Sequence, residues 1–263
     1  MSCSDPYLKE LRARGYNVVR LPKADIRPLQ LLAKRGDTLD RIGELVTVLP
    51  AGSIPPPPLK EDTPVASLSG VHSGELSLGV GLSILGSIIG AMGGSKLGLD
   101  VAYRNARSVT FEFLDVLEDR AEVAKLDQYL AAADVSPFSS YVAKLLDADQ
   151  LYVTTATIKS NKISVESNGS GNTGVDVSVP EIKGVVGGTV KVGAGSGEAS
   201  KVTFEGPLPL VFGFQAVRLF YEKGRYQRFE VLSGGAALEK APAPEAAGTS
   251  LLSEGSFVRM LDV

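Results

Sequence analysis

Apolar and polar residues alternate with a period of two along much of this chain, which is the pattern of half-buried β-strands. The alternation is clearest in RSVTFEFLDV, residues 107–116, where Val109, Phe111 and Phe113 share one face. Between residues 151 and 232 the pattern returns in segments separated by turn residues: LYVTTATI, KISVES, VDVSV, TVKV, KVTFE, LVFGFQAVRLFYE and RYQRFEVL. Such strands predict an antiparallel sheet with one solvent-exposed face, although a membrane barrel requires the same alternation. Periodicity does not separate the two, and the ordinary sheet is our expectation.

Glycine-rich stretches mark the turns between these strands. SNGSGNTG at 167–174 predicts a flexible hairpin tip, and Lys223-Gly224 predicts a tighter one. GAGSG at 193–197 lies between two predicted strands and opens no helix, so it predicts a turn and not a phosphate-binding loop. Nearer the N-terminus, strands are expected in YNVVRL and PLQLLAK, and SIPPPPLKEDTP at 53–64 predicts a proline-stiffened loop.

Helical spacing of apolar residues is seen in fewer places. Leu39, Ile42, Leu45 and Val46 predict a short helix, and two more helices are expected at 122–133 and 137–146. The short linkage between the last two helices suggests a helical layer packed on a sheet.

One segment, residues 76–95, carries no charge and is long enough to pass for a transmembrane helix. It contains six glycines, each of which costs roughly 0.8–1 kcal/mol against alanine in a helix interior. We therefore expect a buried core segment with a strand-like start. The alternative is a segment able to change its conformation.

Composition and charge argue against some classes of function. The chain has 263 residues of which 44% are hydrophobic, enough for a full core. The net charge of −3 argues against a polyanion-binding protein, although residues 1–35 carry an excess of basic residues that could meet phosphates or simply be solvated. With 6% aromatic residues and no tryptophan, we expect no nucleic-acid partner.

Few residues of the chain are candidates for a catalytic site. The single histidine, His72, lies beside Ser69, Ser73 and Glu75, but the members of a catalytic triad usually come from different elements. One cysteine and one histidine cannot make a Cys/His zinc site. We expect no catalytic, metal or cofactor site, and the chain is not expected to be an enzyme.

The one cysteine, Cys3, lies in MSCSDPY, directly before a good helix opening at Asp5-Pro6. No apolar leader precedes a cleavage site, and Ser2 stands where myristoylation needs glycine, so the expected location is cytoplasmic. Reversible acylation of Cys3 and a chance cysteine at a tolerant terminus both remain open.

The end of the chain changes in composition. Residues 233–250, SGGAALEKAPAPEAAGTS, are typical of an extended, protease-accessible linker. The tail that follows, 251–263, regains apolar residues that need a groove: Leu251, Leu252, Phe257, Val258, Met260 and Leu261. Such a tail is either the last packed element of the fold or a removable plug.

Four stretches, in their order and spacing, closely resemble the bacterial gasdermins over most of residues 2–232. They are SCSDPYLKELRARGYNVVRLPKADIRPLQLLAKRG, LSLGVGLSILGSIIGAMGGSKLGLD, ADQLYVTTATIKS and PLVFGFQAVRLFYEKGRY. The resemblance implies an α+β fold: a twisted, mainly antiparallel central sheet flanked by helices, with a short autoinhibitory C-terminal tail. Residues 1–232 would be the pore-forming domain, 233–250 the protease-sensitive linker and 251–263 the autoinhibitory peptide.

The resemblance also implies a function in antiphage defence. An activating protease would remove the tail from a cytoplasmic, monomeric precursor. The N-terminal part would then bind the lipids of the inner membrane and insert in it. There it would oligomerise into a β-barrel pore and kill the cell. Membrane hairpins would come from about 69–116 and 151–204. In members that carry it, the terminal cysteine is palmitoylated, which maps onto Cys3, and no other cofactor is implied.

We expect cleavage in the region of Leu238, Glu239 and Lys240, although the sequence does not give the cut bond. Lys240 suits a trypsin-like protease and Leu238 one that prefers apolar residues; a caspase-like protease is a further alternative. A lipid-anchored cytoplasmic scaffold or binding module without pore activity is the alternative function.

Overall fold

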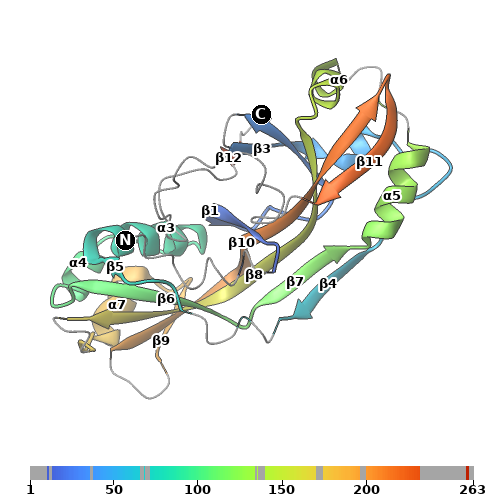
Figure 1. The fold of residues 1–263 in the computed structure, drawn as a ribbon. Coiled ribbons are helices and arrows are strands. Elements are labelled where there is room, and N and C mark those ends of the chain that lie inside the picture. Colours follow the sequence, from blue (N-terminus) through green and yellow to red (C-terminus); the bar gives the residue numbers. More distant parts are fainter. Residues whose placement is uncertain are drawn as a thin grey trace.

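The computed structural model describes residues 11, 14–35, 38–65, 68, 72–133, 135, 140–169, 174–195, 200–231 and 259–260. Within these ranges the chain forms a twisted 12-stranded sheet with helices packed around it, an α+β architecture (Figure 1). The strand pairs are antiparallel except for one short parallel pair at the C-terminal end of the described chain. The expected fold class is therefore confirmed.

Two long strands form the centre of the sheet. β8 (Leu151–Asn168) has 18 residues and β10 (Lys201–Glu222) has 22, and they pair antiparallel along most of their length. Each merges two segments that the sequence predicted as separate strands. β10 continues into β11 (Arg225–Val231) through Lys223 and Gly224, which both have positive φ, the backbone of a two-residue hairpin turn.

Shorter strands complete the sheet on both sides of this pair. β1 (Asn17–Lys23) pairs with β10, and β2 (Gln30–Arg35) pairs with both β8 and β3 (Thr38–Glu44). The remaining strands are β4 (Leu59–Pro64), β5 (Leu76–Ser77), β6 (Ser108–Leu114), β7 (Leu117–Ala121), β9 (Lys191–Ala194) and β12 (Arg259–Met260). β6 and β7 pair with consecutive parts of β8, β5 with β6, β4 with β7, β9 with β10, and β12 with β3.

Strand pairing is interrupted at the same height on both sides of β8: between β6 and β7 on one side, and within β10 on the other. Asp115, between β6 and β7, has a φ of 49°. On the other side of β8, the register of β10 jumps between residues 205 and 210, a stretch that includes Pro207 and Pro209, whose nitrogens donate no hydrogen bond. We call the part beyond this interruption the distal sheet: β6, residues 162–168 of β8, residues 201–205 of β10, and β9.

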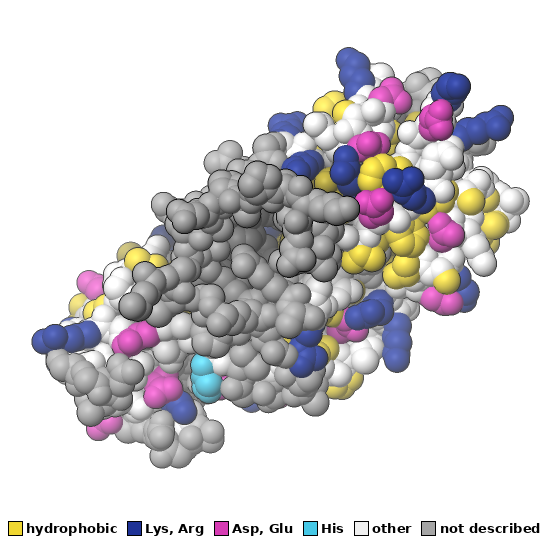
Figure 2. All heavy atoms as spheres, viewed as in Figure 1, with side chains coloured by type: hydrophobic (Ala, Val, Ile, Leu, Met, Phe, Trp, Pro, Cys, Tyr) yellow, Lys and Arg dark blue, Asp and Glu magenta, His cyan; other side chains and the backbone are white. Residues whose placement is uncertain are grey.

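Helices cover the two ends of the sheet separately, as Figure 1 shows. The distal sheet carries α3 (Leu78–Ala91), α4 (Leu99–Ala102) and α7 (Val179–Val186), whose buried residues share one hydrophobic cluster with its strands. The other end carries α2 (Leu45–Val48), α5 (Val123–Ala132) and α6 (Ser140–Asp147) in a second cluster. Charged side chains of both signs are interspersed over the β11 and α5 end of the visible surface (Figure 2).

Three predicted elements are wrong. The helix expected around 39–46 is strand β3 up to Glu44, because pairing with β2 overrides the helical spacing. VDVSV is no strand: Ser178 caps α7, accepting a hydrogen bond from the Glu181 amide at 3.4 Å. The predicted loop 53–64 ends in strand β4, which pairs with β7, a strand the sequence analysis missed.

Among the described residues, no helix is long and apolar enough to cross a membrane. The uncharged segment 76–95 instead contains β5 and the 14-residue α3. The strand-like start is confirmed, and the expected burial holds for one side of the helix only, because Val80 is exposed.

Candidate functional site

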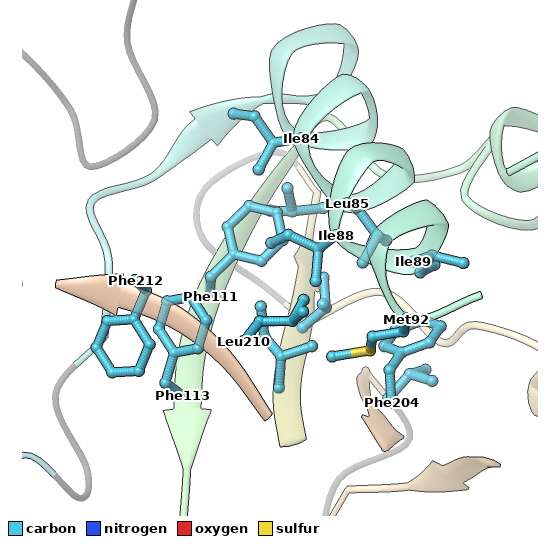
Figure 3. Close-up of a cluster of buried hydrophobic side chains, with 14 of the residues drawn as sticks. Ile84, Leu85, Ile88, Ile89, Met92, Phe111, Phe113, Phe204, Leu210 and Phe212 are labelled. Carbon is cyan, nitrogen blue, oxygen red and sulfur yellow. The ribbon is translucent and has the colours of Figure 1, made fainter. Parts of the chain in front are cut away.

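Helix α3 lies across the apolar face of the distal sheet and is the most distinctive site of the molecule (Figure 3). Its buried side chains point toward aromatic and aliphatic residues of β6 and β10. Those from the helix side are Ile84, Leu85, Ile88, Ile89 and Met92, and those from the sheet side are Phe111, Phe113, Phe204, Leu210 and Phe212. Phe113 and Phe212 stack with ring centroids 4.1 Å apart. Burial of each large side chain contributes up to about 1.5–3 kcal/mol, so packing holds α3 in place.

Two glycines of this region are needed for that close packing. A Cβ on Gly81 would overlap the Cγ2 of Val109, and one on Gly94 would lie 2.7 Å from the Cγ2 of Ile89. By contrast, Cβ atoms on Gly79 and Gly90 would meet nothing within 4 Å. Gly81 therefore permits contact with β6 and Gly94 permits close packing against Ile89 and Val186, whereas Gly79 and Gly90 only lower the stability of the helix.

The ends of α3 add little stability of their own. Ser77 makes no side-chain capping hydrogen bond, and the helix has no acidic residue in its first turn and no basic residue in its last. A helix of this length with four glycines is marginal in water, so its conformation depends on tertiary contacts. Nearby on the outer surface, Val80, Leu97 and Val101 are exposed apolar residues, with Leu97 79% exposed.

The last described residues of the chain lie on the edge of the sheet formed by β3. β12 pairs with β3 in parallel, with Arg259 opposite Asp40 and Met260 opposite Arg41. The carboxylate of Asp40 is buried: its Oδ2 lies 3.5 Å from Nε of Arg35, while its Oδ1 has no hydrogen-bond partner among the described residues. The C-terminal segment thus covers backbone groups that β3 would otherwise present at an open edge.

An ion cluster joins β4, β7 and β8 next to the distal sheet; its Asp119 is buried, whereas its Asp62 is exposed. Nζ of Lys159 lies 2.6 Å from Oδ2 of Asp119 and 2.8 Å from Oδ1 of Asp62. Burial alone lowers the pKa of Lys159, but hydrogen bonds to both carboxylates outweigh it and raise the pKa above its usual value. The ammonium is therefore charged in the folded protein and ties three strands together.

Near it, the hydroxyl of Tyr16 donates a hydrogen bond to the carboxylate of Glu118, which also pairs with Arg120 at 2.6 Å. Burial, followed by the hydrogen bond and charge of Glu118, raises the pKa of Tyr16. This contact joins the residue before β1 to β7, so the N-terminal part of the described chain is anchored to the sheet.

The structure does not assemble the residues that could have suggested catalysis. Nδ1 of His72 lies 3.8 Å from Oε2 of Glu112, whereas the Ser73 hydroxyl bonds to backbone atoms, accepting from the Phe111 amide at 2.8 Å. Glu75 accepts a hydrogen bond from Ser108 and is no partner of His72 in the described contacts. Over all residues that the structure describes, no group of three His, Cys, Asp or Glu residues could hold a metal ion.

Several residues singled out from the sequence lie outside the described residues. They are Ser69, Cys3, the cleavage region Leu238, Glu239 and Lys240, and the tail residues Leu251, Leu252, Phe257, Val258 and Leu261. Met260 is the one tail residue of that set whose backbone the structure places, in β12. Sequence reasoning missed Asp40 and the Lys159 cluster, because nothing in a linear pattern shows which charges of separate strands meet.

Comparison with known proteins agrees with the fold. The model of the Bacterial Gasdermin Family matches residues 19–225. The chain is 53% identical to a gasdermin from a Desulfuromonadales bacterium over the full length of both, and 43% identical to one from Lysobacter enzymogenes over 93% of this chain and 91% of the relative.

A solved bacterial gasdermin from Bradyrhizobium tropiciagri has the same fold, with a TM-score of 0.57 at 17% identity, covering 86% of this chain and 92% of that chain. That structural match shows a shared fold alone, and membership of the family rests on the sequence matches. The chain therefore belongs to the bacterial gasdermins, a family of pore-forming proteins.

Proposed function

We propose that this chain is the autoinhibited precursor of a membrane pore. Removal of the C-terminal peptide by a protease would free the N-terminal part to insert in the inner membrane, oligomerise and kill the cell as a defence against phage. The observation that carries the proposal is the distal sheet, which has one apolar face held under a helix of low intrinsic stability. A sheet with one apolar and one polar face is suited to meet lipid once its cover leaves.

The position of β12 supports the proposed autoinhibition. A segment bound to the edge of β3 and tethered through residues 233–250 benefits from a high effective concentration before the linker is cut. Cutting the linker removes the tether, so the peptide dissociates on dilution. Departure of β12 would also leave the β3 edge open to another strand.

Membrane attachment would use two signals. A single acyl chain on Cys3 anchors a protein only marginally, so a second contact is needed. The exposed Val80, Leu97 and Val101 beside α3 offer apolar side chains at the end of the molecule that would insert. Replacing Cys3 with Ala should weaken killing while folding and linker cleavage stay intact; unchanged killing would remove Cys3 from the mechanism.

The test of the pore is leakage of dye-loaded liposomes made from bacterial inner-membrane lipids. We expect leakage from a chain ending at Leu238 and none from the intact chain. An intact chain with a specific protease site placed at 238–240 should begin to leak dye only after that protease is added. No leakage from either cleaved form would refute pore formation, and leakage from the intact chain would refute autoinhibition by the tail.

A second variant tests the contact of the tail with β3. Asp40→Asn removes the buried charge opposite Arg259, and we expect the uncut chain to become leaky. Asp25→Asn is the matched control: Asp25 lies 3.5 Å from Arg41, as Asp40 lies 3.5 Å from Arg35, but the side chain of Asp25 is 52% exposed. Equal leakage from the two variants would show that Asp40 has no specific part in holding the tail.

A further inference from the structure

The end of the sheet that carries α2, α5 and α6 has one covered edge and one open edge. We call this end the proximal sheet: β3, β2, residues 151–153 of β8, residues 217–222 of β10, and β11. At one edge β12 pairs with β3, whereas at the other edge β11 pairs with β10 and, among the described residues, with no further strand. Val231 of β11 is an exposed apolar residue at this open edge. An unpaired strand edge of this kind can accept a strand from another chain.

One row of residues crosses the proximal sheet from edge to edge. The register places five residues opposite one another on neighbouring strands: Arg41 of β3, Leu32 of β2, Tyr152 of β8, Arg218 of β10 and Glu230 of β11. Arg41 and Glu230 are the two ends of this row, and four strand spacings, or about 19 Å, separate them. Residues in register lie on the same face of a sheet, so both charges belong to one face.

The strands at the two edges run in the same direction. Every neighbouring pair from β3 through β2, β8 and β10 to β11 is antiparallel, so β3 and β11 both run parallel to β8. β12 also runs parallel to β3. When a second copy lies beside the first in the same orientation, its β11 meets β3 in parallel as well. β12 therefore occupies the place that β11 of a second copy would take, and it runs in the same direction.

We propose that β11 of one copy pairs with β3 of the next once β12 has left, and that this contact joins the copies of the oligomer. The inference rests on the proposed pore function and names the two surfaces through which the copies associate. The contact is heterologous, because it joins two different edges, and copies linked in this way can close into a ring. In the intact chain β12 blocks the β3 edge, so association waits for removal of the tail.

Charge favours this pairing. When the row continues across the contact, Glu230 of the second copy lies opposite Arg41 of the first. Within one copy, Arg41 lies 3.5 Å from Asp25 and Glu230 lies 3.3 Å from Nη2 of Arg228, and the side chains of Asp25 and Arg228 are 52% and 65% exposed. Exposed ion pairs of this kind are weak, so they hold neither charge away from a facing strand. Opposite charges on facing residues stabilise a strand pair, whereas like charges destabilise it.

The experiment reverses one charge at a time in intact chains that carry the specific protease site at 238–240, which are then cut on dye-loaded liposomes. Arg41→Glu alone and Glu230→Arg alone each place like charges at every contact, and each should lower the initial leakage rate several-fold. An equimolar mixture of the two variants should restore most of the rate, because alternating copies again bring opposite charges together. The chain with both changes should also leak like the parent. Rescue within a single copy is ruled out by the distance of about 19 Å between the two positions.

The matched controls reverse two exposed charges of α6, Lys144→Glu and Asp147→Lys. Neither should lower the leakage rate, alone or mixed. Leakage from Arg41→Glu and Glu230→Arg at the rate of the parent would overturn the pairing. So would two slow variants that neither the mixture nor the combined variant rescues. Absence of leakage from the cut parent would refute the pore itself, so the two failures are distinguishable.

Thermal denaturation of the intact variants shows whether each one folds. Where a reversed charge prevents folding, the variant Arg41→Cys, Glu230→Cys decides the question in a chain that also carries Cys3→Ala. Facing residues of paired strands are close enough for a disulfide, so mild oxidation after cutting should give a ladder of cross-linked copies on a denaturing gel. The uncut chain should give none. A cut chain without the ladder would overturn the pairing of β11 with β3.

Discussion

Helix α3 should resist pore formation when its own stability is increased. Gly79→Ala and Gly90→Ala place methyl groups where nothing lies within 4 Å, so neither change creates a clash. Each should stabilise the helix by roughly 0.5–1 kcal/mol, together about 1–2 kcal/mol. For a chain of this size that corresponds to a rise in Tm of about 2–8 °C. If α3 unwinds before the rate-limiting step of insertion, the same free energy slows pore formation by about 5- to 30-fold.

The assay pairs thermal denaturation of the intact double variant with the initial rate of liposome leakage by the form ending at Leu238. Gln128→Ala, an exposed position on α5, is a control that should leave the leakage rate unchanged. Gly81→Ala is the opposite control: its Cβ would overlap Val109, and overpacking should destabilise the protein by about 1–3 kcal/mol. A higher Tm with an unchanged leakage rate would refute unwinding of α3 before the rate-limiting step, and an unchanged Tm would refute the stability argument itself.

Three further outcomes are expected. Phe204→Ala empties a fully buried site under α3 and should lower the free energy of unfolding by about 3–5 kcal/mol, measured by urea denaturation, with Phe204→Leu costing less. Lys159→Met leaves Asp119, whose side chain is 7% exposed, without its cation and should cost about 3 kcal/mol at pH 7 in the same measurement. Because the pKa of Lys159 is raised on folding, its stabilisation is fully present below its unfolded pKa and is lost as the pH rises through the folded one. Tyr103 is buried, and its hydroxyl has no hydrogen-bond partner among the described residues. Tyr103→Phe should therefore leave the free energy of unfolding at pH 7 unchanged or raise it. Because burial raises the pKa of Tyr103, the same variant should also lose less stability above about pH 10. A Tyr103→Phe variant that is less stable at pH 7, or a Lys159→Met variant as stable as the parent, would contradict these assignments.

The alternation of apolar and polar residues determined much of the sheet. It predicted β6, β11 and both halves of β8 and β10, because a strand buried on one face must repeat every two residues whatever its partners are. Helix α5 and the turn at Lys223-Gly224 also follow from local residues. The family resemblance likewise needs only the order of residues along the chain.

What local patterns could not decide was pairing. Residues 39–44 have helical spacing but form β3 because β2 supplies a partner, and the charged strands β4 and β7 are held by each other and by the Lys159 cluster. For the candidate site, the sequence showed an uncharged, glycine-rich segment, and it could not say that Gly81 permits contact with Val109 while Gly79 does not touch the sheet.

The sequence therefore shows the chemistry of each residue, but it does not show which residues of distant segments lie next to it. Residue order alone shows which strands are amphipathic and where an acylatable cysteine and an apolar tail lie. The three-dimensional structure was needed to show that α3 covers one face of the distal sheet, that charged residues of separate strands meet on the other face, and that β12 pairs with β3. Periodicity reports which side of an element is buried, whereas contacts between distant segments depend on strand register and on packing across the whole fold.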